Sequence, residues 1–412
     1  MKKTDYLIIG AGLTGCGIAL ELAKKGNSVT LIEQDSLPMN RASLRNEGKI
    51  HLGLIYAADP KGLTGKIQLK GALNFYSILQ SWLGEEIKKI EVSTPFTYLV
   101  ANDSLISPRE LEFHYQNLEL EYQKLIDQNP KLNYLGIKPR WLARQIPLDQ
   151  IRNNFNLSKF QAAFATNERA INTDDLAKVI RNHVISNNKI NLIPYAKVID
   201  LFDYKSHFKV VAELNGSSTY IEIEAVMIFN AAWDQRLSLD KFVGLENPKN
   251  WLHRLKYRVV TDLPQTYIKF PSATIVLGAY GDVVMRQNSA YLSWYPTGML
   301  GWSNDLAPPV EWNRACNNYL TDAQSLEVGR EIIRQTLDWY PSLSLLDSQT
   351  FKVDAGVIFA YGESDVDQIK SELHDRSKVG IRRKNNFFSV DPGKLTTAPI
   401  FAVEAVNIAL NT

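Results

Sequence analysis

Apolar residues along the chain form short continuous runs and helically spaced stretches, and the two patterns alternate near both ends. An apolar run over residues 6–9 predicts a buried strand, and residues 13–25 continue as a helix. A second strand is predicted over residues 28–32. At the other end, the pattern predicts a strand over residues 387–390 and a helix over residues 398–410. Strand–helix units of this kind are typical of a parallel sheet.

The middle of the chain mixes long helices with short alternating segments. Helices are predicted over residues 64–83, from residue 108 to about residue 128, and over residues 173–186 and 323–339. Ser107 and Pro108 are typical of a helix start. Short strands are predicted over residues 90–100, within 190–225, into Asn230, and over 255–262, 274–279, 282–285 and 290–295.

This interleaving predicts an α/β fold with two domains. A discontinuous Rossmann-like, nucleotide-binding domain is expected from residues 1–85, 150–237 and 352–412. Residues 86–149 and 238–351 are expected to form an inserted α+β substrate domain that contains an antiparallel sheet.

Composition gives no reason to expect a polyanionic partner. The 412 residues include 46 Lys and Arg against 44 Asp and Glu, so the formal net charge is only +2 and no nucleic-acid partner is expected. The basic cluster at residues 381–384 is interpreted as solvated loop charge. The two cysteines, Cys16 and Cys316, fit a reducing compartment, and no Cys or His spacing suggests a metal.

The N-terminal residues and the lengths of the apolar runs suggest where in the cell the protein is located. The first predicted strand begins almost at Met1, which leaves no room for a signal peptide. No apolar run approaches the roughly 18 residues of a membrane span. A cytoplasmic protein is therefore expected, with loose attachment to a membrane surface left open.

The turn between the first strand and the first helix carries a phosphate-binding pattern. Gly10, Gly12 and Gly15 form G-x-G-x-x-G, in which the glycines permit a tight turn, a close approach to a diphosphate and close packing of helix on strand. Glu33 ends the second strand, where a carboxylate can accept hydrogen bonds from ribose hydroxyls and would repel a 2′-phosphate. The pattern predicts dinucleotide binding, disfavours NADP and leaves FAD and NAD open.

A second motif follows Glu33. Residues 41–53, RASLRNEGKIHLG, place glycines, small residues, Arg41, Arg45, Lys49 and His51 in one loop. Such a loop can run beneath a dinucleotide, with Arg or Lys balancing its charge. A solvated basic loop is the alternative interpretation.

Three segments together resemble a known family. GAGLTGCG, RASLRNEGKIHLG and the terminal DPGKLTTAP resemble the D-amino-acid-oxidase-like superfamily of FAD-dependent oxidoreductases, which includes glycine oxidase, L-2-hydroxyglutarate dehydrogenase and FAD-linked glycerol-3-phosphate dehydrogenase. The resemblance implies FAD rather than NAD. It also implies that residues 196–198 and the turn at Asn230–Trp233 lie near the nucleotide, although Ala232 stands where the usual turn has glycine.

The motifs and the resemblance together give the expected cofactor contacts. They are Gly10, Ala11, Gly12, Leu13, Thr14, Gly15, Glu33, Gln34, Arg41, Ser43, Arg45, Asn46, Gly48, Lys49, Ile50, Val198, Ala231, Ala232, Gly393, Lys394, Leu395, Thr396 and Thr397. The helix that follows Thr397 offers free N–H groups and a dipole that can stabilise negative charge on a flavin ring.

The catalytic residues are less constrained by the sequence. Histidine is the residue type most often used for proton transfer near neutral pH, so His51 is a candidate general base, although a polar core residue or a cofactor contact fits it equally. Tyr295 and Arg286 are candidates to line the substrate pocket. The Arg that the glycerol-phosphate branch shows after its Ala-Gly is replaced here by residues 358–360, Ile-Phe-Ala, which argues against transferring that substrate. Candidate anion clamps are Arg376, Arg382 and Arg258.

The predicted reaction is removal of a hydride, from a C–H next to an amine or hydroxyl of a small anionic substrate, to flavin N5. Oxygen or a quinone is the expected electron acceptor. The alternatives are a quinone-linked dehydrogenase, a biosynthetic tailoring or RNA-modifying flavoenzyme, and a protein that holds FAD without catalysis.

Overall fold

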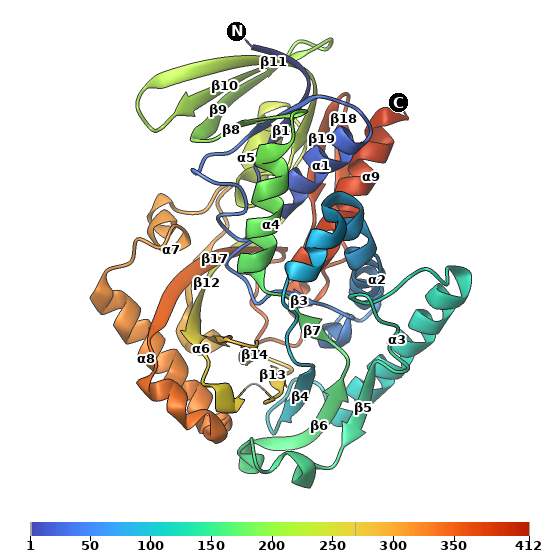
Figure 1. Ribbon diagram of the computed structural model, residues 1–412, viewed down its shortest axis with the longest axis vertical. Helices are drawn as coiled ribbons and strands as arrows, with labels where there is room; N and C mark the ends of the chain where they lie inside the picture. The colour runs from blue at the N-terminus through green and yellow to red at the C-terminus, as the bar shows by residue number, and fades with distance from the viewer. Residues whose placement is uncertain (1, 268, 412) are drawn as a thin grey trace.

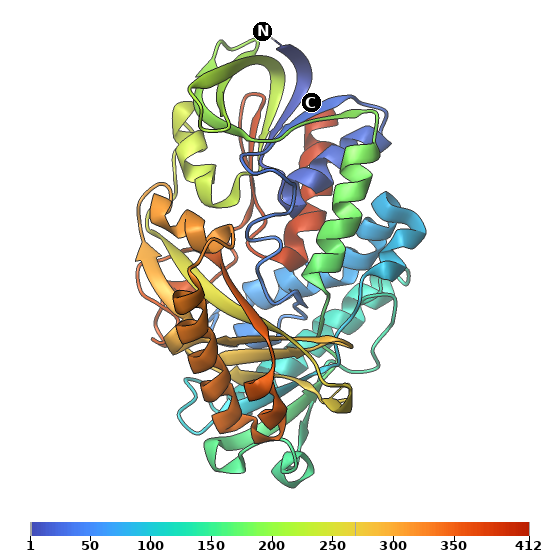
Figure 2. The same ribbon diagram turned by 60° about the vertical axis from the view of Figure 1, so that its left-hand side comes forward.

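The computed structural model describes residues 2–267 and 269–411, which are arranged around two large β-sheets (Figure 1). One sheet lies at the end of the molecule that carries both termini, and the other lies at the opposite end (Figures 1 and 2). The helices are α1 (Leu13–Lys24), α2 (Leu63–Leu83), α3 (Pro108–Gln128), α4 (Thr173–Ser186), α5 (Arg236–Phe242), α6 (Tyr295–Gly298), α7 (Asn313–Cys316), α8 (Asp322–Trp339) and α9 (Ala398–Leu410).

Successive groups of strands along the chain belong to one large sheet and then to the other, apart from β3 and β7. They are β1 (Lys2–Ile9), β2 (Val29–Ile32), β3 (Lys49–Ile50), β4 (Phe96–Ala101), β5 (Ala143–Ile146), β6 (Phe160–Thr166), β7 (Arg169–Ala170), β8 (Ile190–Ile193), β9 (Ala196–Asp203), β10 (Phe208–Leu214), β11 (Thr219–Asn230), β12 (Trp251–Asp262), β13 (Ser272–Val276), β14 (Gly281–Met285), β15 (Ser289–Trp294), β16 (Met299–Ser303), β17 (Phe351–Tyr361), β18 (Gly380–Lys384) and β19 (Phe387–Asp391).

The first sheet has a parallel centre in the order β19-β11-β1-β2-β8. Ile9 pairs with both Ile32 and Asn230, and Asn230 pairs with Ser389, so the carboxyl ends of four strands meet at one edge. In open α/β sheets, ligands bind outside this edge. The register therefore places the glycine turn and the end of β2 beside each other.

Side chains of β1 alternate between two hydrophobic layers. Ile8 packs with helices α1, α2, α4 and α9 in one core. Leu7 and Ile9 face the other way, against the antiparallel extension β9–β10 and against Leu239 of α5. This alternation is the period of two that a strand imposes, and it explains why the short apolar run at residues 6–9 is buried on both faces.

The second sheet has the order β16-β12-β15-β14-β13-β4-β6-β5, with β17 also paired along β12. Its pairs are antiparallel except that β13 and β4 are parallel. Helix α8 covers it, since Ile332 and Trp339 share a core with Val259 and Leu292. A two-stranded ribbon of β3 and β7 lies apart from both sheets.

The predicted α/β fold with an added antiparallel sheet is confirmed. The predicted helix start at Ser107 and Pro108 is confirmed, and the structure shows Ser107 and Glu110 bonded reciprocally there in a capping box. The division into domains stays a prediction. Strand β6 and all but the first residue of β17 lie within the residues predicted for the nucleotide-binding domain. Both strands nevertheless pair within the second sheet.

One interpretation of the sequence was wrong. Residues 381–384 are not a solvated loop, because they belong to β18, which pairs with β19 at the edge of the first sheet. Arg382 in this strand donates to the carboxylate of buried Asp240 and to the carbonyl oxygen of Glu246. A basic strand was hard to recognise because its charges are satisfied by a neighbouring helix.

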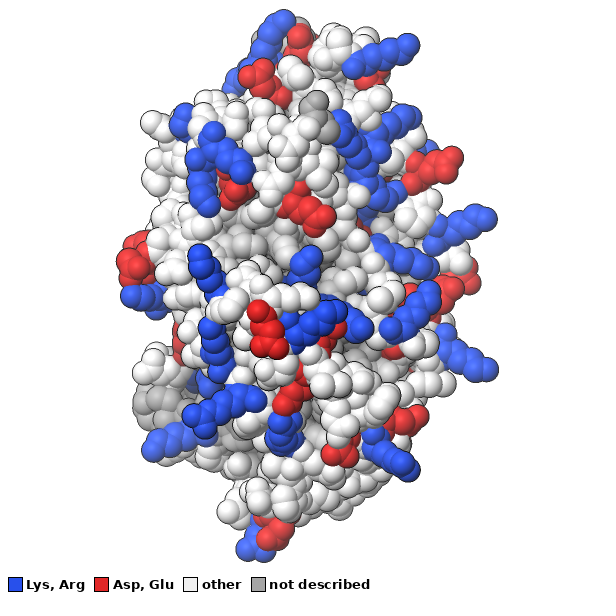
Figure 3. All heavy atoms as spheres, turned by 90° about the vertical axis from the view of Figure 1, so that its right-hand side faces the viewer, with Lys and Arg blue, Asp and Glu red and all other residues white. Residues whose placement is uncertain are grey.

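Basic and acidic side chains are mixed over the face in Figure 3, which shows Lys and Arg spread among Asp and Glu. No helix among residues 2–267 and 269–411 is long and apolar enough to cross a membrane.

Candidate active site

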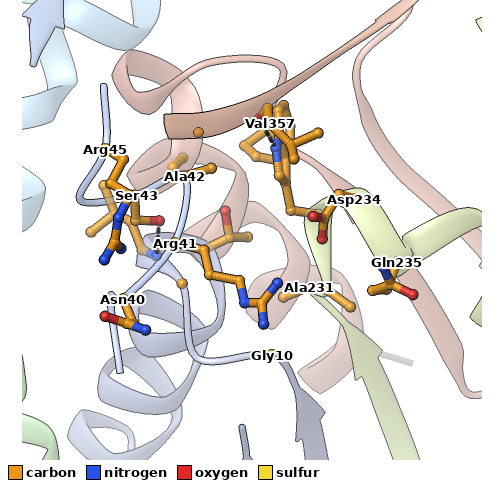
Figure 4. A pocket seen from close by; sticks show the side chains of 18 of the residues that line it. Gly10, Asn40, Arg41, Ala42, Ser43, Arg45, Ala231, Asp234, Gln235 and Val357 are labelled. Atoms are coloured by element: carbon orange, nitrogen blue, oxygen red, sulfur yellow. Dashed lines mark hydrogen bonds between the residues drawn. The ribbon is translucent and has the colours of Figure 1, made fainter. Parts of the chain in front are cut away.

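A cavity of about 450 Å³ lies at the carboxyl edge of the first sheet and reaches β12 and β15 of the second. The loop of residues 40–45 forms one wall, and Figure 4 shows it passing across the start of α1 near Gly10. Ala231, Asp234 and Gln235 lie on the opposite wall (Figure 4). The cavity therefore joins segments from the start, the middle and the end of the chain.

The glycines of the turn are required by their surroundings. Gly10 has φ of +92°, and a Cβ there would lie 2.9 Å from the Ala231 carbonyl oxygen. A Cβ on Gly15 would lie 1.9 Å from the Gly10 oxygen, so only glycine lets α1 pack on β1. Gly12 has room except for Ser43 Oγ at 3.1 Å, and it borders the cavity. The N-terminus of α1 borders the cavity, and its Leu13 N–H donates to Ser43 Oγ at 2.9 Å.

Glu33 ends β2 at the cavity wall. Its carboxylate accepts the Ala11 N–H at 2.7 Å and the Asp35 N–H at 3.0 Å. Burial raises the pKa of Glu33 to about 7, although both N–H donors act in the opposite direction. The acid is thus held in place by the glycine turn and partly withheld from water.

Two arginines of the following loop have different surroundings. Arg41 is bound to Asp35 at 2.8 and 2.9 Å, and it also donates to Asn313. Arg45 is buried, and its Nε lies 3.4 Å from Asp354, yet neither Nε nor Nη1 makes a hydrogen bond. Arg45 lines the cavity, and these two nitrogens are buried beside Asp354 without a hydrogen bond to any described residue.

Across the cavity, Asp282 of β14 binds two lysines. Its Oδ1 lies 2.8 Å from Lys49 Nζ, and its Oδ2 lies 3.7 Å from Lys256 Nζ. Burial works against the Asp282 charge, but the two lysines outweigh it and hold the pKa of this carboxyl below its usual range. Tyr291 lies close enough to Lys256 for the two side chains to interact electrostatically. Lys49, Lys256 and Tyr291 all line the cavity.

His51 lies at the same end of the cavity. Its backbone N–H donates to Thr396 Oγ1 at 2.9 Å, which ties it to the C-terminal loop. Its ring Nε2 lies 3.8 Å from a Glu47 carboxylate oxygen, and its Nδ1 lies 3.7 Å from a Glu168 carboxylate oxygen. Burial opposes the charge of Glu47, but His51, Lys256 and Lys394 outweigh it and hold the pKa of Glu47 well below its usual range.

Lys394 and Arg376 are two cations with no carboxylate in ion-pair range within residues 2–267 and 269–411. Lys394 lines the cavity, and burial together with the nearby charge of Arg376 lowers the pKa of Lys394 to about 8, despite Glu47. Burial lowers the pKa of Arg376 to about 10, with Arg254 contributing. Within the described chain, the Arg376 guanidinium donates to the Leu373 and Phe359 carbonyl oxygens.

Most of the predicted cofactor contacts line the cavity. These are Gly10, Gly12, Leu13, Thr14, Glu33, Gln34, Arg41, Ser43, Arg45, Asn46, Lys49, Val198, Ala231, Ala232, Gly393, Lys394 and Leu395. The others lie behind its wall, namely Ala11, Gly15, Gly48, Ile50, Thr396 and Thr397. Gly48 has φ of +76°, and a Cβ there would lie 2.1 Å from the Ile171 oxygen, so it shapes the loop.

The three candidate catalytic residues do not lie together at the cavity. His51 lines the cavity, whereas Tyr295 and Arg286 do not. Tyr295 donates to Asp365 and accepts from Arg254 at 2.7 Å. Arg286 is directed at the Glu47 and Ile171 carbonyl oxygens.

Two of the candidate anion clamps are already paired. Arg258 is bound to Asp354 at 2.6 Å, and Arg382 to Asp240, so neither is free for a ligand. Arg376 has no carboxylate partner among the residues that the structure describes, and it does not line the cavity.

Sequence reasoning missed several cavity residues, notably Glu47, Lys256, Tyr291 and Asp234. Lys256 and Tyr291 lie on strands whose register brings them to the cavity, and no local pattern marks them. Glu47 carried a signal, because it stands in the loop motif four residues before His51.

A cavity at the carboxyl edge of a parallel sheet, with a glycine turn and an acid at the end of the second strand, defines a dinucleotide-binding protein. Residues 5–365 match the sequence model of the family described as FAD dependent oxidoreductase (DAO). The chain belongs to this family, whose cofactor is FAD.

Curated relatives match only part of this chain. It is 45% identical over 71 residues to a glycerol 3-phosphate dehydrogenase of Caloramator mitchellensis, a match that covers 17% of this chain and 14% of the relative. It is 32% identical over 90 residues to a glycerol 3-phosphate oxidase of Mycoplasma pneumoniae, which covers 22% of this chain and 21% of the relative.

Solved structures resemble the whole chain at low identity. The L-α-glycerophosphate oxidase of Mycoplasma pneumoniae with FAD bound has a TM-score of 0.64 and 17% identity, covering 100% of this chain and 95% of that one. Glycine oxidase from Geobacillus kaustophilus has a TM-score of 0.68 and 12% identity, covering 100% and 96%. These likenesses establish the shared fold.

The residues present fit FAD. Arg45 and the glycine turn at the start of α1, where a Cβ on Gly12 would point toward Ser43 at the cavity, suit an anionic diphosphate. Glu33 suits a ribose, and residues 393–395 also line the cavity.

Proposed function

We propose that the protein uses FAD to oxidise a small anionic substrate at a C–H next to a hydroxyl or an amine. The single observation that carries this proposal is a pair of partly or fully buried cations. Lys394 lines the cavity together with His51, and Arg376 lies outside the lining, close enough to Lys394 and Tyr56 to interact with them electrostatically. Neither cation has an ionic partner in the described chain. Buried cations are normally paired, so two without carboxylates favour an anionic ligand.

The neighbouring groups suit the same ligand. The Tyr56 hydroxyl is buried without a hydrogen bond, and its ring lies 5.5 Å from that of His51. Arg376 is close enough to Tyr56 for the charge of the guanidinium to lower the pKa of the phenol, although burial raises it overall. An anion held by Arg376, Lys394 and Tyr56 would place its adjoining carbon near His51.

Bound FAD supplies the acceptor for the hydride. The chain supplies the rest: His51 accepts the proton of the substrate hydroxyl or ammonium, and the Glu47 and Glu168 carboxylates stabilise the imidazolium that forms. Lys394 and Arg376 orient the anionic group, which is a carboxylate or a phosphate. The substrate leaves as a carbonyl compound or as a protonated imine, so electrons and protons balance.

The experiment is an anaerobic screen of purified, FAD-loaded protein. Glycerol 3-phosphate, 2-hydroxy acids and amino acids are each mixed with it, and loss of the flavin absorbance is recorded. Saturable bleaching by at least one anionic compound supports the proposal, whereas bleaching only by neutral alcohols or amines contradicts it.

The electron acceptor is proposed to be oxygen or a quinone. Hydrogen peroxide formed with substrate in air would support oxygen, and reduction of a soluble quinone without peroxide would support a quinone-linked dehydrogenase.

A further inference from the structure

The carboxylate of Glu168 is one of the most completely buried charges beside the candidate site. Glu168 lies between β6 and β7 and is 0% exposed. Its Oε2 accepts the Leu52 N–H at 2.6 Å, and its Oε1 accepts the Tyr98 hydroxyl at 2.5 Å. Burial opposes the charge, but His51 and Lys49 outweigh it and lower the pKa of Glu168. The group is therefore ionised and fixed in direction.

This carboxylate faces one nitrogen of His51 in particular. Its Oε1 lies 3.7 Å from Nδ1, which is buried and has no hydrogen-bond partner among the described residues. The other nitrogen, Nε2, is turned toward Glu47, which lines the cavity. Glu168 does not line the cavity, so it lies behind the imidazole and Nε2 lies in front.

We propose that Glu168 is a positioning residue that holds His51 with its proton on Nδ1, so that the Nε2 lone pair is presented to the cavity. A neutral imidazole carries one N–H, and both of its nitrogens face a carboxylate here. The N–H belongs on the side of the carboxylate that is held in place: Glu168 is 0% exposed and fixed by Leu52 and Tyr98, whereas Glu47 is 16% exposed and lines the cavity. The inference rests on the proposed role of His51 as proton acceptor. It adds the residue that makes Nε2 rather than Nδ1 the basic atom.

Two other groups face the ring, and Glu47 competes with Glu168 for the imidazole proton. Glu47 approaches Nε2 from the same loop, and Tyr56 offers the edge contact of its ring. Glu47 stabilises the ring after Nε2 has taken a proton, whereas Glu168 sets where the first proton resides. In the neutral variant Glu168→Gln, the amide NH₂ can donate to Nδ1 and so favour the inactive Nε2–H tautomer.

The test is nitrogen-15 NMR of the imidazoles in protein labelled at its 6 histidines, with His51 assigned from the His51→Asn variant. Spectra are recorded with and without FAD, and thermal unfolding verifies that each variant is folded. Wild-type His51 is expected as the neutral Nδ1–H form, and E168Q is expected to shift it to Nε2–H. Tyr98→Phe, which removes a buried hydrogen bond but keeps the carboxylate, is expected to leave Nδ1–H in place.

Activity then provides a second readout. E168Q is expected to lower the rate of flavin reduction by about 10²–10⁴-fold with little change in substrate affinity, as for loss of a general base. Nε2–H in the wild type, or an unchanged tautomer in E168Q, would overturn the proposal. The wild-type spectrum decides this even if E168Q does not fold. If His51→Asn keeps full activity, the proposed role of His51 as proton acceptor is wrong. The NMR spectra still decide independently whether Glu168 sets the tautomer.

Discussion

The carboxylate of Glu33 accepts the backbone N–H of Ala11 at 2.7 Å, so the end of β2 is bonded to the glycine turn that follows β1. This bond joins the two parts of the dinucleotide pattern before any ligand is present. It also keeps a carboxylate beside the cavity at a cost in stability, because burial raises its pKa to about 7.

Replacing Glu33 by Gln is therefore expected to change how stability depends on pH. A carboxyl whose pKa is raised on folding contributes stability below its unfolded value and loses it as the pH rises through about 7. Between pH 4.5 and 8, FAD-free wild type should lose about 3 kcal/mol more than E33Q in urea unfolding, since one pKa unit corresponds to about 1.4 kcal/mol. The exposed variant Glu85→Gln should parallel wild type, and equal pH slopes for E33Q and wild type would refute this interpretation of Glu33.

Gly12→Ala tests the glycine turn without breaking the fold. Gly12 has φ of −69°, which alanine adopts freely, and only Ser43 Oγ stands near the added methyl. We expect near-native thermal stability and at least about tenfold weaker FAD binding, because a methyl group there blocks close approach of the diphosphate. FAD affinity is measured by fluorescence titration.

The double variant G12A/S43A serves as the control, because it removes the contact with Ser43 while leaving the methyl toward the cavity. Recovery of FAD affinity in this variant would show that the defect arose within the protein and not at the ligand.

Lys394 should give the reaction a basic pH limit. Its pKa is lowered to about 8 by burial and by Arg376, so its cation is lost as the pH rises through that value. The kcat/KM for an anionic substrate, which reports the free enzyme, should fall above about pH 8. Lys394→Met should have a lower kcat/KM and lack this limb. A limb that persists unchanged in K394M would assign it to another group.

Arg376→Leu should weaken substrate binding more than it alters the chemistry. A hydrogen bond to a charged group contributes about 1.5–3 kcal/mol, so KM should rise by about 10–100-fold. Arg383→Leu is the matched control, because Arg383 is an exposed arginine of the nearby strand β18. Steady-state kinetics with one anionic substrate compare the two, and equal KM values would remove Arg376 from the proposed anion site.

The sequence was sufficient for the parts of the site that are local. The glycine turn, Glu33 and the loop from Arg41 to His51 follow one another, so strand and helix periodicity places them at one edge of the sheet. Lys256 and Tyr291 were not predicted, because their positions depend on the register of β12 and β15 in the second sheet.

Strand β17 shows why some elements were missed. It contains Asp354 and Gly356, which interrupt an apolar strand pattern. Asp354 is buried because Arg258 and Arg45 neutralise it, and a Cβ at Gly356 would lie 2.5 Å from the Arg45 oxygen. Contacts with the loop near residue 45 explain both residues. This loop lies some three hundred residues away in the sequence, so the periodicity of apolar residues in the strand does not reveal it.

The central claim is that bound FAD is reduced by a small substrate whose negative charge is held by Arg376 and Lys394. The most direct measurement is anaerobic flavin reduction by the best substrate and by its neutral analogue, in wild type and in R376L. The account predicts that wild type is reduced much faster by the anion at low concentration, and that R376L loses most of this preference. Equal reduction by the anion and the neutral analogue in wild type would contradict it.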